Sequence, residues 1–297
     1  MRKPTTTLFV VIALVVTLSL PAPAGSVPRS NHVIVVVLEN QSYSEALAYM
    51  PWLKSVALKY SYTRFYYANT HPSIGNYFMM TTGRIITNND GYTGTVAANN
   101  IVRQLIGSGK TWKAYAESLP YTGYIGGNKH PYVKRHVPMA YLTDVRNSSE
   151  KYNLVPFTRF ATDLANGNLP HLSFVVPNNV NNAHDCPWGG SNCSTATKLK
   201  DADDWLRRHI APVLSNREFL QDGILIITFD ESKHSDQARG GGRILTVIAG
   251  PKVKRAYQDQ HNYYQHQSLL RTVEYAFGLA KIGAAASTRS LGNVFVD

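Results

Sequence analysis

Cysteine is scarce in this chain, where only Cys186 and Cys193 occur among 297 residues. Two cysteines cannot form a structural zinc site alone. In an exported protein they predict a disulfide that closes the short segment CPWGGSNC.

Acidic residues are also few, 19 against 30 Lys and Arg, so the formal net charge is +11. Such a chain favours anionic partners, but its positive residues are scattered, so we expect no nucleic-acid role.

Beyond residue 24 the sequence has no apolar run long enough to cross a bilayer. The first residues differ, because Arg2 and Lys3 precede an apolar run over 8–20, and APA at 22–24 offers a small-residue cleavage site. This layout is typical of a secretory signal peptide, with an uncleaved anchor as the alternative. We predict a signal peptide over 1–24, a secreted, periplasmic or extracellular location, and a single domain over 25–297 without repeats or linkers.

Short, continuous apolar runs rich in β-branched residues predict strands that are buried on both faces of a parallel sheet. They cover 32–38, 111–116, 171–177, 223–229 and 243–250. Helical patterns lie between and after them, over 44–60, 97–109, 201–216 and 267–280. We expect the second helix to end at Gly107 and the third to begin at the Asp-rich stretch 201–204. The alternation predicts an α/β domain with a mostly parallel sheet.

Polar residues follow several of these predicted strands. Glu39-Asn40 follows the first run, His184-Asp185 lies beyond the third, and Asp230-Glu231 follows the fourth. Ligands bind beyond the carboxyl ends of strands in open parallel sheets, so these residues predict a polar site there.

The acids and the amide among them are hard oxygen donors. Together with a serine oxygen they could enclose a divalent cation, and calcium, magnesium, manganese and zinc are not distinguished. The alternative is that the acids cap helices or pair with surface Lys and Arg.

Ser73 in THPSIGNY stands where a helical run begins. No G-x-S-x-G elbow surrounds it, so activation as a nucleophile would have to come from a metal and the helix N-terminus. Asn76 could hold a phosphoryl oxygen at the same helix end. The alternative reading of Ser73 is a helix cap contributing about 1 kcal/mol.

Three histidines stand out: His136, His184 and His266. As protonated donors they could bind phosphoryl oxygens or protonate a leaving group. His71 and His234 are weaker candidates. We interpret Lys134 and Arg135 as part of a solvated face.

Eight motifs in order resemble the bacterial phosphoesterase family, which holds secreted acid phosphatases and larger phospholipases C within the alkaline-phosphatase-like superfamily. The resemblance covers nearly all of the chain after residue 24 and is strongest to small acid phosphatases of the mycobacterial phosphoinositide-phosphatase type. The motifs are VVLENQSYSE, THPSIGNY, WKAYAESLP, YVKRHVP, VVPNNVNNAHD, DDWLRRHI, IITFDE and HQSLLRTVEYAFGL.

The resemblance implies a three-layer α/β/α sandwich and a serine nucleophile assisted by a divalent metal. Ser73 would take the phosphoryl group and share the metal. His136 and His184 would bind phosphate or donate a proton, and Asp185 would orient or ligate beside His184. His266 is expected to bind the substrate. The implied metal ligands are Glu39, Asn40, Asp230 and Glu231.

The chain also departs from the family pattern. Gly75 replaces a second proline and is expected to loosen the turn that holds Asn76. Asn182 replaces an acid, Phe229 replaces a tryptophan, and SKHSD after Glu231 lacks the usual acids. The Cys186–Cys193 loop resembles an insertion over the site, in the manner of a lid.

We therefore predict a secreted, metal-dependent acid phosphatase that acts through a phosphoserine intermediate. Its substrates would be small phosphate esters or phospholipid headgroups, with peripheral contact to anionic membranes. The alternatives are a phospholipase C or another phosphodiesterase, and a non-catalytic basic protein that binds the cell envelope.

Overall fold

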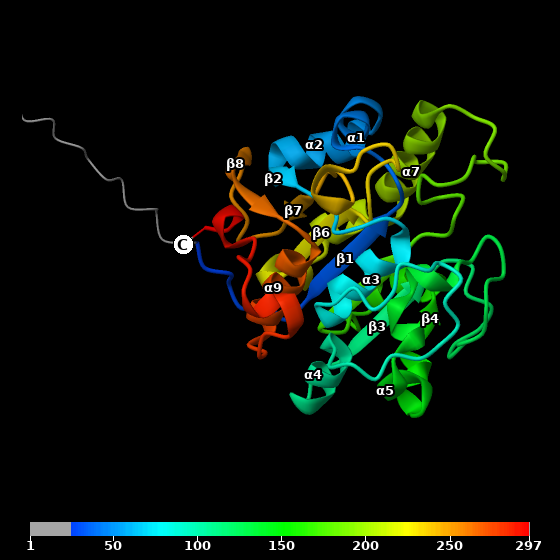
Figure 1. The fold of residues 1–297 in the computed structure, drawn as a ribbon. Coiled ribbons are helices and arrows are strands. Elements are labelled where there is room, and N and C mark those ends of the chain that lie inside the picture. Colours follow the sequence, from blue (N-terminus) through cyan, green and yellow to red (C-terminus); the bar gives the residue numbers. More distant parts are fainter. Residues whose placement is uncertain (1–24, 297) are drawn as a thin grey trace, which may run out of the picture.

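The centre of the computed structural model, which describes residues 25–296, is an eight-stranded sheet with helices on both faces (Figure 1). Along the sheet the strands follow the order β4-β3-β5-β1-β6-β7-β2-β8. Only β7 runs antiparallel to its neighbours β6 and β2 among the strands of this described part. The strands are β1 (Val33–Leu38), β2 (Ser61–Tyr66), β3 (Trp112–Ala116), β4 (Leu154–Pro156), β5 (Leu172–Val176), β6 (Ile224–Phe229), β7 (Val247–Ala249) and β8 (Tyr257–Tyr264).

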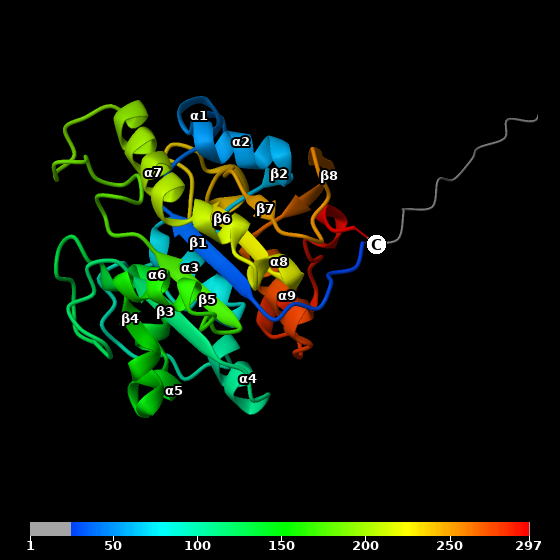
Figure 2. The same ribbon diagram turned by 180° about the vertical axis from the view of Figure 1, so that it is seen from behind.

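Helices cover the two faces of this sheet. Figure 1 shows α3 and α9 over one face, and Figure 2, seen from behind, shows α6, α7 and α8 over the other. The predicted α/β sandwich with a mostly parallel sheet is therefore confirmed. The helices are α1 (Tyr43–Tyr49), α2 (Pro51–Lys59), α3 (Ser73–Thr82), α4 (Ile101–Gly107), α5 (Thr143–Arg146), α6 (Thr158–Ala165), α7 (Thr195–His209), α8 (Phe219–Asp222) and α9 (His266–Phe277).

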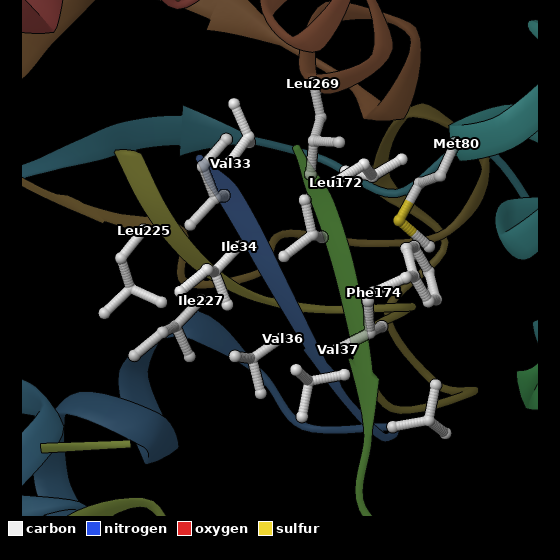
Figure 3. Packing of buried hydrophobic residues seen from close by; sticks show 14 of the residues in the cluster. Val33, Ile34, Val36, Val37, Met80, Leu172, Phe174, Leu225, Ile227 and Leu269 are labelled. Carbon is white, nitrogen blue, oxygen red and sulfur yellow. The ribbon is translucent and has the colours of Figure 1, made fainter. Parts of the chain in front are cut away.

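The hydrophobic core lies on both sides of β1, which is buried along its whole length. Side chains of a strand alternate between the two faces, so β1 contributes to both layers. In Figure 3, Ile34 and Val36 lie beside Leu225 and Ile227 of the paired strand β6. Leu172 and Phe174 of β5 lie toward Met80 of α3 and Leu269 of α9. This packing fixes α3, and with it Ser73, against the centre of the sheet.

Two helix predictions are wrong in their boundaries. The pattern over 44–60 is split into α1 and α2 at Met50, because Pro51 cannot continue the first helix and instead begins the second. Helix α7 begins at Thr195, capped by Ser194, and not at the Asp-rich stretch. Asp203 of that stretch is buried and accepts hydrogen bonds from Trp52 N and Leu53 N, both at 2.8 Å. It caps the neighbouring helix α2 rather than its own.

The sheet is larger than the sequence predicts. Strands β2, β4 and β8 were not expected, because β2 and β8 are polar and aromatic and β4 has three residues. The run over 243–250 forms a strand only at Val247–Ala249, and that strand is antiparallel. The edge strand β8 pairs with β2 alone and carries a polar sequence, YQDQHNYY, as an exposed edge requires.

The two ends of the described chain lie side by side. Gly25 N donates to Asn293 Oδ1 at 2.9 Å, and the neighbouring Val294 O accepts from the hydroxyl of Ser61, the first residue of β2, at 3.4 Å. The predicted signal peptide, residues 1–24, lies outside the described residues. Within 25–296 we find no helix whose length and apolar character would let it span a bilayer.

Candidate active site

The predicted polar residues meet at the carboxyl end of the central strands. Strands β1 and β6 pair in parallel up to Leu38 and Phe229, so Glu39-Asn40 and Asp230-Glu231 leave the sheet at the same level. Asn40 N donates to Asp230 Oδ1 at 3.1 Å, which ties the two strand ends together. Asn40 adopts a left-handed backbone with φ of 49°, a conformation that Asn tolerates better than most residues. The predicted clustering of these four residues is what the structure shows.

Ser73 is the first residue of α3 and is almost completely buried. Its hydroxyl does not cap the helix, since Pro72 holds the cap position and no side chain makes the capping hydrogen bond. Ser73 Oγ instead donates to Glu39 Oε2 at 3.2 Å. The hydroxyl is therefore directed into the cluster of acids, as a nucleophile requires, and away from the backbone of its own helix.

Three carboxyl groups are buried together here. Glu39 and Asp230 have no exposed surface, and Glu231 is 3% exposed. Burial raises the pKa of Glu39 to about 8, and burial together with the charges of Glu39 and Glu231 raises the pKa of Asp230 well above its usual value. Glu39 Oε1 also accepts a short hydrogen bond from Tyr77. Such a cluster is stable only if it takes up protons or gains a positive charge.

The donor chemistry of this cluster fits a divalent cation. Asn40 Oδ1 and Asp230 Oδ2 are buried and find no hydrogen-bond partner within residues 25–296. Carboxylate, amide and hydroxyl oxygens are the ligands of hard cations. In that same range, no three His, Cys, Asp or Glu side chains by themselves enclose an ion. The oxygens of Asn40 and Ser73 would have to complete the shell, and Glu231 is already engaged by His71, whose Nδ1 lies 3.1 Å from its Oε2.

His136 lies beside the carboxylate cluster, but its protonation state differs from the predicted one. Its ring stacks on Tyr77, and its Nε2 lies 3.3 Å from Glu39 Oε2, although the angle is too poor for a hydrogen bond. It is 1% exposed, and burial with the nearby charges of Arg135 and His184 lowers its pKa well below the usual value. His136 is therefore a neutral imidazole, which disagrees with the prediction of a protonated donor.

His184 and Asp185 form an oriented pair in the loop after β5. His184 Nδ1 lies 2.7 Å from Asp185 Oδ1, and His130 Nε2 approaches Asp185 Oδ2 at 3.1 Å. Burial opposes ionisation of Asp185, but the hydrogen bonds from these two histidines outweigh it and lower its pKa. Asp185 thus fixes the orientation of the His184 ring, one of the two roles predicted for it. The Nε2 of His184 is left for a ligand.

These two residues directly precede the loop that the predicted disulfide closes. Cys186 and Cys193 are bonded, with their Cα atoms 5.9 Å apart. A cleft of about 300 Å³ beside the carboxylate cluster is lined by Asn40, His184 and Cys193 among others. A larger cavity of about 590 Å³ lies near Thr111 and Pro170, at the start of β3 and β5. Because it lies at the opposite edge of the sheet, we assign the smaller cleft to the site.

The structure gives His266 a positioning role in place of the predicted contact with substrate. Its Nε2 lies 2.6 Å from the backbone oxygen of Asp230, and its Nδ1 lies 3.3 Å from the hydroxyl of Tyr66. Both ring nitrogens are therefore engaged inside the protein, and the side chain is fully buried at the start of α9. His266 supports the backbone that presents Asp230.

The buried His266 predicts a pH-dependent stability. Burial lowers its pKa to about 4, whereas an unfolded histidine has a pKa of about 6.5. Between these values the unfolded chain binds a proton that the folded protein does not, so stability falls as the pH drops through this range. We expect His266→Gln to flatten this fall by about 1 kcal/mol per pH unit in urea unfolding. The exposed His261→Gln should keep the wild-type slope, and equal slopes in all three proteins would contradict the assignment.

Asn76 holds the loop before Ser73 in place. Its Oδ1 accepts from Asn69 N at 2.9 Å and Thr70 N at 3.2 Å, and its Nδ2 donates to Thr70 O at 2.8 Å. The amide is used within the protein, so the structure gives Asn76 a positioning role in place of the predicted contact to a phosphoryl oxygen. Nor does Gly75 loosen this turn, because it packs closely against the side chain of Thr70.

We expect Gly75→Ala to destabilise this turn. An added Cβ would lie 2.6 Å from Thr70 Cγ2 and against the side-chain oxygen of Asn88, closer than real contacts allow. Overpacking of this kind costs about 1–3 kcal/mol, measurable by denaturant unfolding. Gly107→Ala at the end of α4 is the matched control, since nothing lies within 4 Å of its added Cβ. A stability loss of equal size in both variants would show that contact at Gly75 is not the cause.

The sequence reasoning misjudged several residues around Ser73. His71 is paired with Glu231, and Asp90 Oδ1 accepts from Ile74 N in the first turn of α3 at 3.1 Å. Arg135 Nε lies 3.0 Å from Asp90 Oδ2, so an anion already sits at the helix N-terminus and a cation holds it there. Arg135 thus belongs to the site. Lys134, also interpreted as solvated, is buried with its Nζ 4.2 Å from the centre of the Tyr141 ring.

Known proteins share this architecture and these motifs. A protein in the alkaline phosphatase superfamily from Vibrio parahaemolyticus superposes with a TM-score of 0.57 at 11% identity, covering 90% of this chain and 72% of that one. This chain shares the fold of that protein. The Phosphoesterase family matches residues 46–280. This chain belongs to that family, as its motifs predict.

Two relatives show how this chain compares in length. An acid phosphatase of Aspergillus fumigatus is 32% identical over 268 residues, which cover 85% of this chain and 56% of that protein. A phosphatidylinositol-3-phosphatase of Mycobacterium tuberculosis is 28% identical over 278 residues, which cover 92% of this chain and 86% of that one. The chain therefore spans little more than half of the fungal enzyme.

Proposed function

We propose that this protein is a hydrolase of phosphate monoesters and that Ser73 accepts the phosphoryl group. One observation carries the proposal: the hydroxyl of a serine at the start of α3 donates into a buried group of acids at the carboxyl end of β1 and β6. The family membership and the relatives named as acid phosphatases support the same activity. Where the predicted site residues lie together in the structure, their arrangement is consistent with this chemistry.

The arrangement suggests what each side chain does during turnover. Glu39 accepts the hydrogen bond of Ser73, orients its oxygen for in-line attack on phosphorus and takes up its proton as the new bond forms. His184, held by Asp185, donates a proton to the departing alcohol oxygen from the cleft that it lines. The phosphoserine is then hydrolysed by water. Asn76 and His266 keep the loop before Ser73 and the backbone at Asp230 in place.

A divalent cation completes the proposed site. Glu39, Asn40, Asp230 and Ser73 would hold it, with Glu231 close by. When bound, such an ion offsets negative charge and favours the ionised form of a hydroxyl. The metal could be calcium, magnesium, manganese or zinc.

The relatives also suggest where and on what the enzyme acts. We propose secretion into an oxidising compartment, consistent with the Cys186–Cys193 disulfide. Since one relative is named a phosphatidylinositol-3-phosphatase, phosphoinositides are candidate substrates. Peripheral contact with anionic membranes is consistent with the net charge of +11.

A comparison of monoester and diester substrates tests the proposal. We expect release of phosphate from p-nitrophenyl phosphate at acidic pH and much slower turnover of bis(p-nitrophenyl) phosphate. Release of phosphorylcholine from phosphatidylcholine should be absent. Faster cleavage of the diesters would make the enzyme a phosphodiesterase of the phospholipase C type, and no turnover of any ester would overturn the assignment.

A further inference from the structure

The cleft beside the carboxylate cluster is unusually basic. Its lining includes Asn40 and His184 from the site, Cys193 from the disulfide-closed loop, and the cations Lys198 and Lys233. His234 adds a further basic side chain at the exposed rim. Within the described range 25–296, none of the residues that line this cleft carries a carboxyl group. A cleft of this composition attracts anions.

The cations of this cleft differ in how their charge is balanced. Lys233 forms a close ion pair with Glu45, and His184 is paired with Asp185. Lys198 has no carboxylate within 4 Å among residues 25–296. Its Nζ donates to the backbone oxygen of His184 at 2.7 Å, which leaves two of its three N–H groups free. This half-buried ammonium therefore carries unbalanced positive charge at the wall of the cleft.

The cleft lies where the leaving group of a substrate would extend. In-line attack by Ser73 places the leaving oxygen on the side of phosphorus opposite the serine. Ser73 is buried, and Asn40 belongs both to the carboxylate cluster and to the cleft. A substrate that reaches Ser73 through the cleft would therefore place its alcohol portion beside His184 and Lys198.

We propose that Lys198 binds a second anionic group on the alcohol portion of the substrate. The enzyme thereby prefers phosphate monoesters whose alcohol carries another phosphate over those that carry one phosphate only. This inference rests on the proposed phosphomonoesterase activity. The second phosphate can be a free monoester or the diester of a lipid headgroup, because both present anionic oxygens to an ammonium group.

Three substrates with the same scissile phosphate test this preference. They are inositol 3-phosphate, inositol 1,3-bisphosphate, and a short-chain, water-soluble phosphatidylinositol 3-phosphate. We expect a higher kcat/KM for the two doubly anionic substrates. Lys198→Met should lower their advantage over inositol 3-phosphate about tenfold, the loss of one charge-assisted hydrogen bond. A drop confined to the bisphosphate or to the lipid would identify which source of phosphate Lys198 recognises.

Further variants separate charge from structure. Lys198→Arg should keep the preference, whereas Lys198→Gln, which keeps a donor for the His184 carbonyl but lacks the charge, should lose it. Lys200→Met is the matched control, because Lys200 is exposed on the same helix α7 and does not line the cleft. It should leave all three rates unchanged.

Several outcomes overturn the inference while the proposed function stands. Equal kcat/KM for the three wild-type substrates would do so, as would full preference in Lys198→Gln, which would make Lys198 a positioning residue for His184. A proportional drop on all three substrates in Lys198→Met leads to the same conclusion. If the protein hydrolyses neither these substrates nor p-nitrophenyl phosphate, the proposed function fails. Calorimetric binding of inositol 1,3-bisphosphate to wild type and Lys198→Met then tests the anion site alone, and equal affinities refute it.

Discussion

Ser73→Ala is expected to lower kcat for p-nitrophenyl phosphate by at least about 10³-fold, with the fold intact. The hydroxyl is the one group that the proposed chemistry cannot replace, because it forms the bond to phosphorus. Removing it leaves the acids, His184 and the cleft in place, so substrate binding should persist. The structural cost should be small, since Ser73 Oγ does not cap α3 and its hydrogen bond is to Glu39.

Trapping the intermediate makes this test independent of rate. Acid quenching of wild type during turnover should give a phosphoryl adduct on the peptide that contains Ser73, detected by mass spectrometry, and Ser73→Ala should give none. Ser173→Ala is a matched control, because Ser173 is equally buried, lies within β5, and its hydroxyl finds no partner among the described residues. An adduct on another residue, or a Ser73→Ala enzyme within a few-fold of wild type, would remove Ser73 from the chemistry.

Removing divalent metal is expected to lower activity by at least about 10²-fold, with recovery when a suitable cation is added back. The reason lies in the acids themselves. Burial raises the pKa of Glu39 to about 8, and burial with the neighbouring acids raises the pKa of Asp230. At neutral pH the metal-free site should therefore hold protons, and a bound cation should displace them.

The displaced protons give a measurement that does not depend on turnover. Calorimetric titration of a chelator-treated protein with calcium, magnesium, manganese or zinc, in buffers of different ionisation enthalpy, should show proton release near pH 7. Asp230→Asn should weaken binding and reduce the number of protons released. Asp222→Asn is the matched control, because Asp222 lies at the end of α8, before β6, at the far edge of the sheet. If chelators change neither the activity nor the stability of the protein, this result would argue against a bound metal.

The parts of the fold that the sequence predicts well are those set by burial. The runs at 32–38, 171–177 and 223–229 are continuous and apolar because β1, β5 and β6, respectively, are covered on both faces. Their polar ends then place Glu39 and Asp230 together by topology alone. Strands β2 and β8 have no such pattern, because they lie at one edge of the sheet with one side partly exposed.

The roles of individual side chains are harder to predict from the sequence than the fold is. His266 and His136 stand in motifs that suggest contact with substrate, yet their chemistry is decided by burial and by the groups that each ring contacts. The Asp230 carbonyl that contacts His266 and the Tyr77 ring that stacks on His136 are distant from them in sequence. Asp90 sits in an ordinary Asn-Asp-Gly turn, and no local signal connects it to Ile74 of α3 or to Arg135. Asp203 of α7 caps the helix α2, and no local sequence signal connects these two helices either.

The position of the chain ends bears on how the enzyme can be tethered. Gly25 and Asn293 meet near Ser61, at the amino ends of the strands, while Glu39 and the cleft lie past the carboxyl end of β1. A strand of six residues is about 20 Å long, so a support joined at Gly25 or Asn293 would be held about this far behind Glu39 and the cleft. An enzyme immobilised in this way would turn its basic cleft outward, toward substrates that arrive from solution or from a facing surface.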